Sequence, residues 1–280
     1  MKKEIYSNWP YILWFVFYFL LFWSILGGTA KILGFLLIVY SVSLVIAFSP
    51  ISESLYRSLT GARRLLTKAE KDRLLPLFIE VYLKATKIEP YLPRNIYPYI
   101  QENWDMNAFA FGQGTLALTR GSINLLSDDC LKGMIAHELG HFAHFDTAML
   151  LIAAIGNLLM SILMIIIQGI ANVLYQIAQN IDPILGTCFK GMYWVVNGTY
   201  RFIQFIGDVI LMSVSREHEY MADSFAHDCG YGKELTTALY QIYQVSISNR
   251  GSIIEQLRST HPPLPERISR LERLSDKLIE

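Results

Sequence analysis

Two long apolar runs near the start of the chain restrict its fold more than any other feature. Residues 11–28 and 32–49 contain no charged side chain, and each is about as long as a helix that crosses the hydrocarbon core of a bilayer. Lys2 and Lys3 precede the first run, as in a signal peptide, but the run is long and aromatic and lacks a small-residue cleavage site. The second run follows at once. We therefore predict a retained transmembrane hairpin.

The composition agrees with an integral membrane protein. The chain of 280 residues is 52% hydrophobic and only 17% charged, whereas charged residues make up about 25% of a typical soluble protein. Its formal net charge is zero, so no overall field favours nucleic acid, and we expect no nucleic-acid partner. Three cysteines without a CxxC pair are too few for a disulfide scaffold.

Two further apolar runs predict a second hairpin. The run 148–167 is a convincing span, while 195–214 is weaker because it contains several polar residues. Among them, Arg201 and Asp208 lie seven residues apart and would share one face of a helix, where they could pair within a bundle. The alternative for this fourth run is a helix that lies along the membrane surface. Together the runs predict about four transmembrane helices.

The positions of lysine and arginine predict the orientation. These residues concentrate in 1–10, 51–146 and 215–280, and the positive-inside rule places such segments in the cytoplasm. We therefore predict a multi-pass protein of the cell (inner or plasma) membrane with both termini cytoplasmic. The N-terminal hairpin is 1–50 and the second hairpin is 147–214, so that the cytosolic segments 51–146 and 215–280 can meet.

Local patterns suggest how the cytosolic segments fold. The basic segment 51–75 is predicted to be helical, with a solvated face near anionic lipid headgroups. Gly112 and Gly114 separate two short runs of strand character, which predicts a hairpin or small sheet. After the fourth apolar run, 216–227 is predicted as another helix. The fold class is thus a mainly α integral membrane protein with a cytosolic α+β core.

The sequence His-Glu-Leu-Gly-His at 137–141 carries the clearest chemical signal. On a helix, His137 and His141 project from one face about one turn apart, which suits two positions around a tetrahedral zinc ion. Glu138 lies beside them and can accept a proton from a metal-bound water as the water attacks a carbonyl. Because so short a pattern also arises by chance, a third ligand is needed.

A carboxylate on a second helix is the best candidate for that ligand. The metzincin pattern is excluded, because His144 and Thr147 stand where it needs glycine and histidine. Glu219 and Asp223 lie at i and i+4 on one helix face, so Glu219 can bind zinc while Asp223 accepts the free ring N–H of a zinc histidine, His137 by preference. Two rivals are considered and ranked lower, Glu217, which points away from Asp223, and His227, one turn further on.

Topology supports this ligand set. His141 precedes the third apolar run by about seven residues and Glu219 follows the fourth by about five, so each lies within roughly 10 Å of the membrane surface. A hairpin returns the chain to the side that it left. The two helices can therefore share one metal, whereas an odd number of crossings would separate them.

Several motifs in a fixed order resemble the HtpX-like membrane zinc metalloproteases, whose core is shared with the Ste-type CAAX prenyl proteases. The resemblance extends over most of the chain. The matching motifs are 137–141, Arg216 with Glu219 to Asp223, Ser259 to Pro263 with Glu266 to Ile268, Asn107 to Ala110, and Leu116 to Gly121.

This resemblance implies a gluzincin-type endopeptidase with one zinc ion per chain and a zincin-like core at the cytoplasmic membrane surface. Its implied substrates are membrane-associated or misfolded polypeptides. It also implies that His261 and Arg267 reach the site and stabilise an oxyanion. The alternatives are a loop histidine and, for Arg267, a surface ion pair with Glu266 or Glu272. The implied strand that pairs with an extended substrate comprises Asn107, Ala108, Phe109 and Ala110.

Other functions remain open at this stage. A CAAX-type peptidase would need more spans than this chain offers, and a peptidase dedicated to one signalling regulator would look the same in sequence. A membrane scaffold with a structural zinc would normally use four ligands, often cysteines, and would not need Glu138. The lipid bilayer is an expected partner in every case, and the sequence does not predict an oligomeric state.

Overall fold

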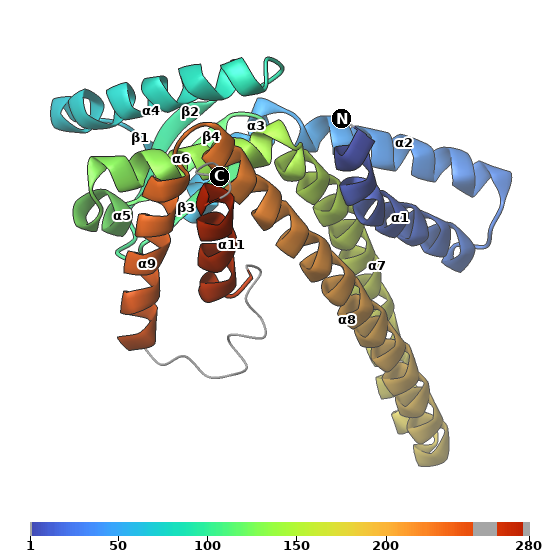
Figure 1. Cartoon of the computed structure of the whole chain (residues 1–280). Coiled ribbons are helices and arrows are strands. Elements are labelled where there is room, and N and C mark those ends of the chain that lie inside the picture. Colours follow the sequence, from blue (N-terminus) through green and yellow to red (C-terminus); the bar gives the residue numbers. More distant parts are fainter. Residues whose placement is uncertain (1, 249–261, 277–280) are drawn as a thin grey trace. The chain divides into compact units, whose positions relative to one another are not determined.

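The computed structural model describes residues 2–248 and 262–276 (Figure 1). The chain divides into two compact units, each built from separate stretches of sequence. We call the first the sheet unit; it comprises residues 1–8, 45–151 and 214–280. We call the second the hairpin unit; it comprises residues 9–44 and 152–213.

The sheet unit contains the small sheet that the sequence predicts. Four strands lie in the order β1-β2-β4-β3: β1 (Ala62–Arg64), β2 (Tyr97–Gln101), β4 (Thr115–Thr119) and β3 (Ala108–Phe111). β2 and β4 run parallel, and the other two pairings are antiparallel. β3 and β4 form the expected hairpin, which turns at Gly112 with φ of 62°, a left-handed conformation that glycine adopts readily. No further strand pairs with the outer edge of β3 among the described residues.

The sheet unit also contains helices that pack on the sheet or on one another. They are α3 (Pro50–Thr60), α4 (Lys68–Ile88), α5 (Arg120–Leu125), α6 (Asp128–Ala143), α9 (Gly232–Ser248) and α11 (Leu264–Asp276). The segment 51–75 is therefore not one helix, because Gly61 ends α3 in the left-handed conformation and β1 follows. α4 then begins with a capping box between Thr67 and Glu70.

α6 is the central helix of the sheet unit and is buried along most of its length. Ser127 caps its first turn by accepting a hydrogen bond from the Cys130 N–H, and two aspartates lie at its positive end. A Cβ on Gly133 would come within 2.4 Å of the Leu235 nitrogen on α9, and one on Gly140 within 2.8 Å of the Ala222 Cα. Glycine at these two positions lets neighbouring helices approach α6 closely.

Two very long helices follow α6. α7 (Asp146–Ile181) and α8 (Pro183–Asp228) are separated only by Asp182. The sequence predicts the fourth apolar run and 216–227 as separate helices, and this is wrong, because α8 continues through both. The sequence has no proline after Pro183 until Pro262, so nothing in this stretch removes a backbone donor and forces a break.

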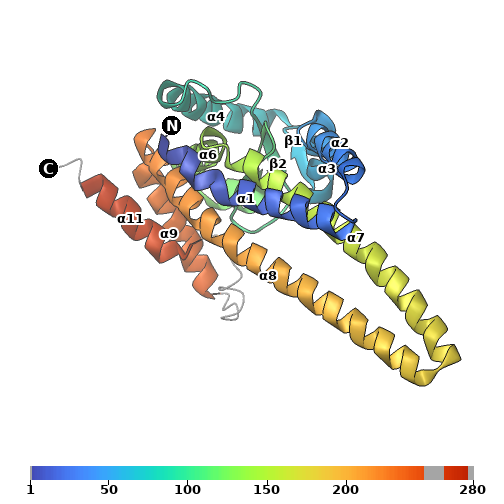
Figure 2. The ribbon, with the colours of Figure 1, turned by 90° about the vertical axis from the view of Figure 1, so that its right-hand side faces the viewer.

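In the hairpin unit, α1 (Lys2–Ile25) packs against the middle parts of α7 and α8, and α2 (Ala30–Ala47) packs against α1 through Tyr40. α7 and α8 run in opposite directions (Figure 2). The buried centre of this unit contains Trp14, Tyr18 and two methionines, Met160 and Met164. The Trp14 ring N–H donates to the Asn157 side chain at 3.2 Å.

Several polar residues of this unit pair between α7 and α8. The Gln168 amide donates to the Asn197 oxygen at 3.0 Å, and the Ser161 and Tyr200 hydroxyls lie 3.1 Å apart. Such bonds between neighbouring helices satisfy polar groups that would be costly to expose to lipid. Asn197, one of the polar residues that weaken the fourth apolar run in the sequence, thus serves in helix packing.

Two described helices, α2 and α7, are long and apolar enough to cross a membrane, and 9–25 is a shorter apolar segment of α1. The mainly helical fold with a small sheet is confirmed. The number of crossings, about four by the sequence pattern, stays a prediction. The predicted Arg201–Asp208 pair involves a side chain, that of Asp208, outside the described residues.

Candidate metal centre

Three side chains from two helices converge in the sheet unit as the sequence predicts. His137 and His141 lie on α6 and Glu219 on α8, and each offers a ligand atom within 4.8 Å of the other two. The Nε2 atom of His137 lies 3.5 Å from one Glu219 oxygen, and that of His141 lies 3.6 Å from the other. A tetrahedral zinc ion with bonds of about 2.0–2.1 Å separates its ligand atoms by roughly 3.4 Å, so these residues fit zinc.

A carboxylate orients each histidine from behind. The Nδ1 of His137 lies 2.9 Å from Asp223, the predicted partner, and the Nδ1 of His141 lies 2.9 Å from Asp146. A ring N–H bonded to a carboxylate fixes the tautomer that presents Nε2 to a metal, and it makes that nitrogen more basic. Both imidazoles therefore have the arrangement typical of zinc ligands.

The role of Asp146 is the main feature that sequence reasoning missed. Its place just after the zinc helix predicts only a residue that caps or orients the end of that helix. Phe145, the residue before it, has a φ of 62°, which is rare outside glycine and turns the chain between α6 and α7. The turn brings Asp146 back to His141. The second oxygen of Asp146 lies 3.1 Å from His218 Nδ1. A carboxylate five residues beyond the second histidine was the only signal.

The electrostatics of the centre favour a cation. Burial lowers the pKa of both imidazoles and Arg267 lowers that of His137, but hydrogen bonds to the neighbouring carboxylates outweigh these influences. The pKa of His137 is raised, and that of His141 is raised well above its ordinary value. The same negative field that stabilises an imidazolium would stabilise a divalent metal ion in its place. Glu138 is buried beside them, 6% exposed.

Arg267 lies inside the centre rather than on the surface. It is 5% exposed, and its guanidinium bonds to both oxygens of Asp223, at 2.6 and 2.9 Å. A third nitrogen lies 2.9 Å from Glu219. The charge of Arg267 is thus directed at two carboxylates of the centre, and not at Glu266 or Glu272. His261, the other predicted oxyanion group, lies outside the described residues.

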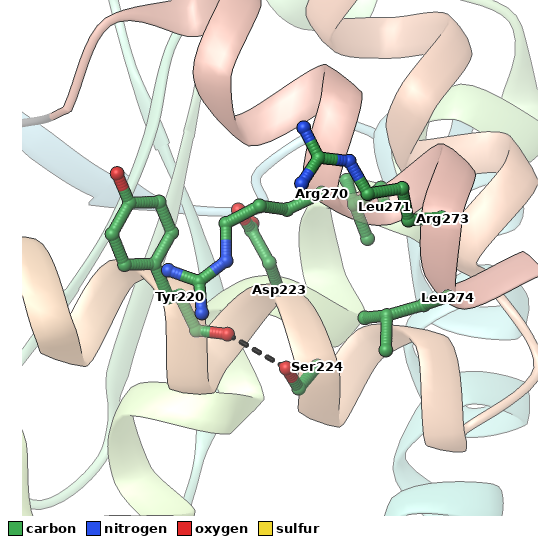
Figure 3. A pocket seen from close by; sticks show the side chains of 7 residues that line it. All are labelled: Tyr220, Asp223, Ser224, Arg270, Leu271, Arg273 and Leu274. Atoms are coloured by element: carbon green, nitrogen blue, oxygen red, sulfur yellow. Dashed lines mark hydrogen bonds between the residues drawn. The ribbon is translucent and has the colours of Figure 1, made fainter.

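A cavity of about 220 Å³ lies beside Asp223, between α8 and α11 (Figure 3). It is lined by Tyr220, Asp223, Ser224, Arg270, Leu271, Arg273 and Leu274. The Arg270 guanidinium stacks 3.8 Å from the centre of the Tyr220 ring. Apart from Asp223, the lining offers no carboxylate or imidazole, so this cavity is a neighbour of the centre and not a second metal site.

The predicted substrate strand lies next to the metal helix. Ala108, Phe109 and Ala110 belong to β3, which packs against α6. Asn107 precedes the strand and anchors it, since its N–H donates to the Thr119 hydroxyl at 3.0 Å and its side chain accepts from the Ala108 N–H at 2.9 Å. An edge strand with free backbone groups is the arrangement that pairing with an extended peptide requires.

Comparison with known proteins agrees with this centre. The sequence profile of peptidase family M48 matches residues 84–275, which include all three candidate ligands. The chain belongs to peptidase family M48. Proteins called protease HtpX homolog are similar over nearly the whole chain: that of Dictyoglomus turgidum is 26% identical over 95% of this chain and 89% of its own length. That of Aquifex aeolicus is 28% identical, over 91% and 88%.

A solved structure shows a related fold. The crystal structure of S. mikatae Ste24p matches with a TM-score of 0.54 and 19% identity, over 92% of this chain and 61% of that one. This M48 chain therefore spans less than two thirds of the Ste24p chain. The resemblance to HtpX-like membrane metalloproteases related to CAAX proteases is confirmed, and so is a membrane-bound metalloprotease over its alternatives.

Proposed function

We propose that this chain is an HExxH zinc endopeptidase of the gluzincin type, with one zinc ion held by His137, His141 and Glu219. The observation that carries the proposal is the convergence of the three ligand atoms at the spacing of a tetrahedral zinc site, with a carboxylate behind each imidazole. A structural zinc would normally have a fourth protein ligand. The described residues offer a group of three, which leaves room for water and substrate.

The residues of the chain divide the work of peptide hydrolysis. Zinc, when bound, supplies Lewis acidity to the attacking water and the scissile carbonyl. Glu138 accepts a proton from that water and passes it to the leaving amine. Arg267 neutralises and orients Asp223 and Glu219, as its bonds to both suggest. Stabilisation of the oxyanion by Arg267 and His261 stays a prediction.

We further propose that the substrates are membrane-associated or misfolded polypeptides cut at the cytoplasmic face. The length and apolar composition of α2 and α7 support this, because both suit a membrane span and α7 begins directly after the metal helix. The free edge of β3 would bind the substrate main chain, which favours recognition of extended segments over one particular sequence. Comparing cleavage products in membranes with and without the protein would separate general turnover from cleavage of one dedicated regulator.

The variant Glu138→Gln tests the proposed function. It removes the base but none of the ligands, so we expect zinc content to stay at one per chain while casein cleavage falls by ~10²–10⁴-fold or more. The protein is purified in detergent with chelator present, zinc is then added, and bound zinc, casein cleavage and autoproteolysis are followed together. His141→Ala should lose both zinc and activity. A zinc-loaded Glu138→Gln protein that cuts casein at the rate of the unaltered protein would refute the mechanism.

A further inference from the structure

Helix α3 has one face packed on the sheet and one face that is apolar and exposed to solvent. Ile51, Leu55 and Leu59 follow one another at i, i+4 and i+8 and so form a continuous stripe. Their side chains are 72%, 60% and 77% exposed. We call these three residues the α3 stripe. Three large aliphatic side chains exposed in a row indicate a surface that contacts something apolar.

The opposite face of α3 is fixed to the β3–β4 hairpin. Glu53 accepts the backbone N–H groups of Gln113 and Gly114 at 2.5 and 3.0 Å, so its carboxylate closes the turn between the two strands. The Tyr56 ring stacks on Phe111, with ring centres 3.6 Å apart. α3 therefore holds the end of β3 directly.

Further contacts keep α3 from rotating. One Arg57 nitrogen donates to the Thr115 hydroxyl at 2.9 Å and to Glu53 at 3.1 Å, and its guanidinium lies 5.0 Å from the centre of the Tyr99 ring. Turning the stripe inward would take Glu53 away from the Gln113 and Gly114 N–H groups and Arg57 away from the Thr115 hydroxyl. The apolar face is thus held outward by the polar bonds of the other face.

The start of α3 is tied to the end of a candidate membrane span. α2 ends at Ala47 and α3 begins at Pro50, and the Ser52 hydroxyl donates to the Ala47 carbonyl across the junction. Val45, in the last turn of α2, is 71% exposed, so exposed apolar surface continues from the span towards the stripe. Two connecting residues reach only about 7 Å. A helix placed there, with one apolar face and one polar face, suits the interface of a bilayer.

We propose that α3 lies in the surface of the bilayer, with the α3 stripe inserted at the boundary between headgroups and acyl chains. Because the same helix clamps the β3–β4 hairpin, the bilayer then sets the height of the β3 edge. Given the proposed function, this edge would accept extended segments of polypeptide close to the membrane surface. The membrane would act as part of the substrate-binding device.

Insertion is tested without any measurement of cleavage. Nitroxide labels are attached at Leu55→Cys or, as a control, at Leu125→Cys on α5, which is also 60% exposed, in a Cys188→Ser background. The protein is reconstituted in phosphatidylcholine and phosphatidylglycerol vesicles. For each label, the rate of collision with oxygen is divided by the rate of collision with a water-soluble nickel complex. We expect this ratio to be at least threefold higher for the label at 55 than for the label at 125. Equal ratios would overturn the proposal, and so would shielding of label 55 from both reagents, which would mean a protein partner.

The consequence for substrates has its own test. Leu55→Asp with Leu59→Asp should lower cleavage of a membrane-anchored peptide about tenfold and leave casein cleavage unchanged, while Leu125→Asp changes neither. Leu55→Ser with Leu59→Ser should show a smaller loss of the same kind and guards against misfolding of the charged variant. Equal loss on both substrates in both double variants would contradict the link to the membrane. If Glu138→Gln still cut casein at the rate of the unaltered protein, the proposed chemistry would be wrong. The nitroxide result would still stand, because it does not depend on cleavage.

Discussion

At the scale of single residues, the two ring nitrogens of each histidine in the centre have different roles. One ring nitrogen faces the metal position and the other is held by a buried carboxylate, 2.9 Å away in both cases. The sequence predicts one of these carboxylates, Asp223, because it shares a helix face with Glu219. It does not predict the role of Asp146, because a left-handed Phe145 has to turn the chain before that side chain can reach His141.

Asp146→Asn tests this role. The amide keeps the shape of the carboxylate but loses its charge, so the His141 ring is less basic and less firmly oriented. We expect the zinc affinity to fall by about 10–100-fold, as measured by competition with a fluorescent chelator in detergent. Asp129→Asn, at a side chain 76% exposed at the start of α6, should not change it. Unchanged zinc affinity in Asp146→Asn would mean that Asp146 serves only the helix junction.

At the scale of elements, the centre depends on how closely α6 and α8 approach. Gly140, between the two histidines of the motif, faces Ala222 on α8, three residues beyond Glu219. The HExxH motif allows many residues at position 140. The close contact with α8 excludes a larger residue, because a Cβ there would meet a backbone atom of α8. Because Gly140 has no side chain, α6 and α8 can lie close enough for the candidate ligands on the two helices to meet.

Gly140→Ala should therefore loosen the site. A Cβ would lie 2.8 Å from the Ala222 Cα, so α8 must move and carry Glu219 with it. We expect stability to fall by about 1–3 kcal/mol and zinc to bind more weakly, as measured by thermal unfolding with and without zinc. Gly191→Ala on the same α8 is the matched control, since nothing lies within 4 Å of its Cβ position. An unchanged melting temperature and zinc affinity in Gly140→Ala would show that the helices have room to spare.

At the scale of the whole molecule, the proposal requires an even number of crossings between the two halves of the site. α7 leaves the metal helix, the chain reverses at Asp182, and α8 returns with Glu219. The reversal point would then lie on the side of the membrane opposite to the metal centre. This part of the topology depends on charge distribution and on apolar length, and it stays a prediction.

The native cysteines offer a direct test of this topology. Cys188, six residues after the reversal, is exposed, while Cys130 and Cys229 are buried. We expect a membrane-impermeant maleimide to label Cys188 in intact cells. Asp129→Cys in a Cys188→Ser background, in the first turn of the metal helix, should be labelled only after the membrane is opened. Labelling of Asp129→Cys in intact cells as fast as that of Cys188 would place the metal centre outside and overturn the orientation.

What the sequence alone determined are features that depend on local periodicity. Histidines four residues apart, a carboxylate pair at the same spacing and apolar runs of membrane length can be read from the order of residues. They predicted the three candidate ligands, which the structure brings together, and the family. What only the tertiary structure decided are contacts between distant segments: the Asp146–His141 bond, the burial of Arg267 and the clamp of α3 on β3. These depend on turn geometry and on close approach of backbones, which no spacing within one element encodes.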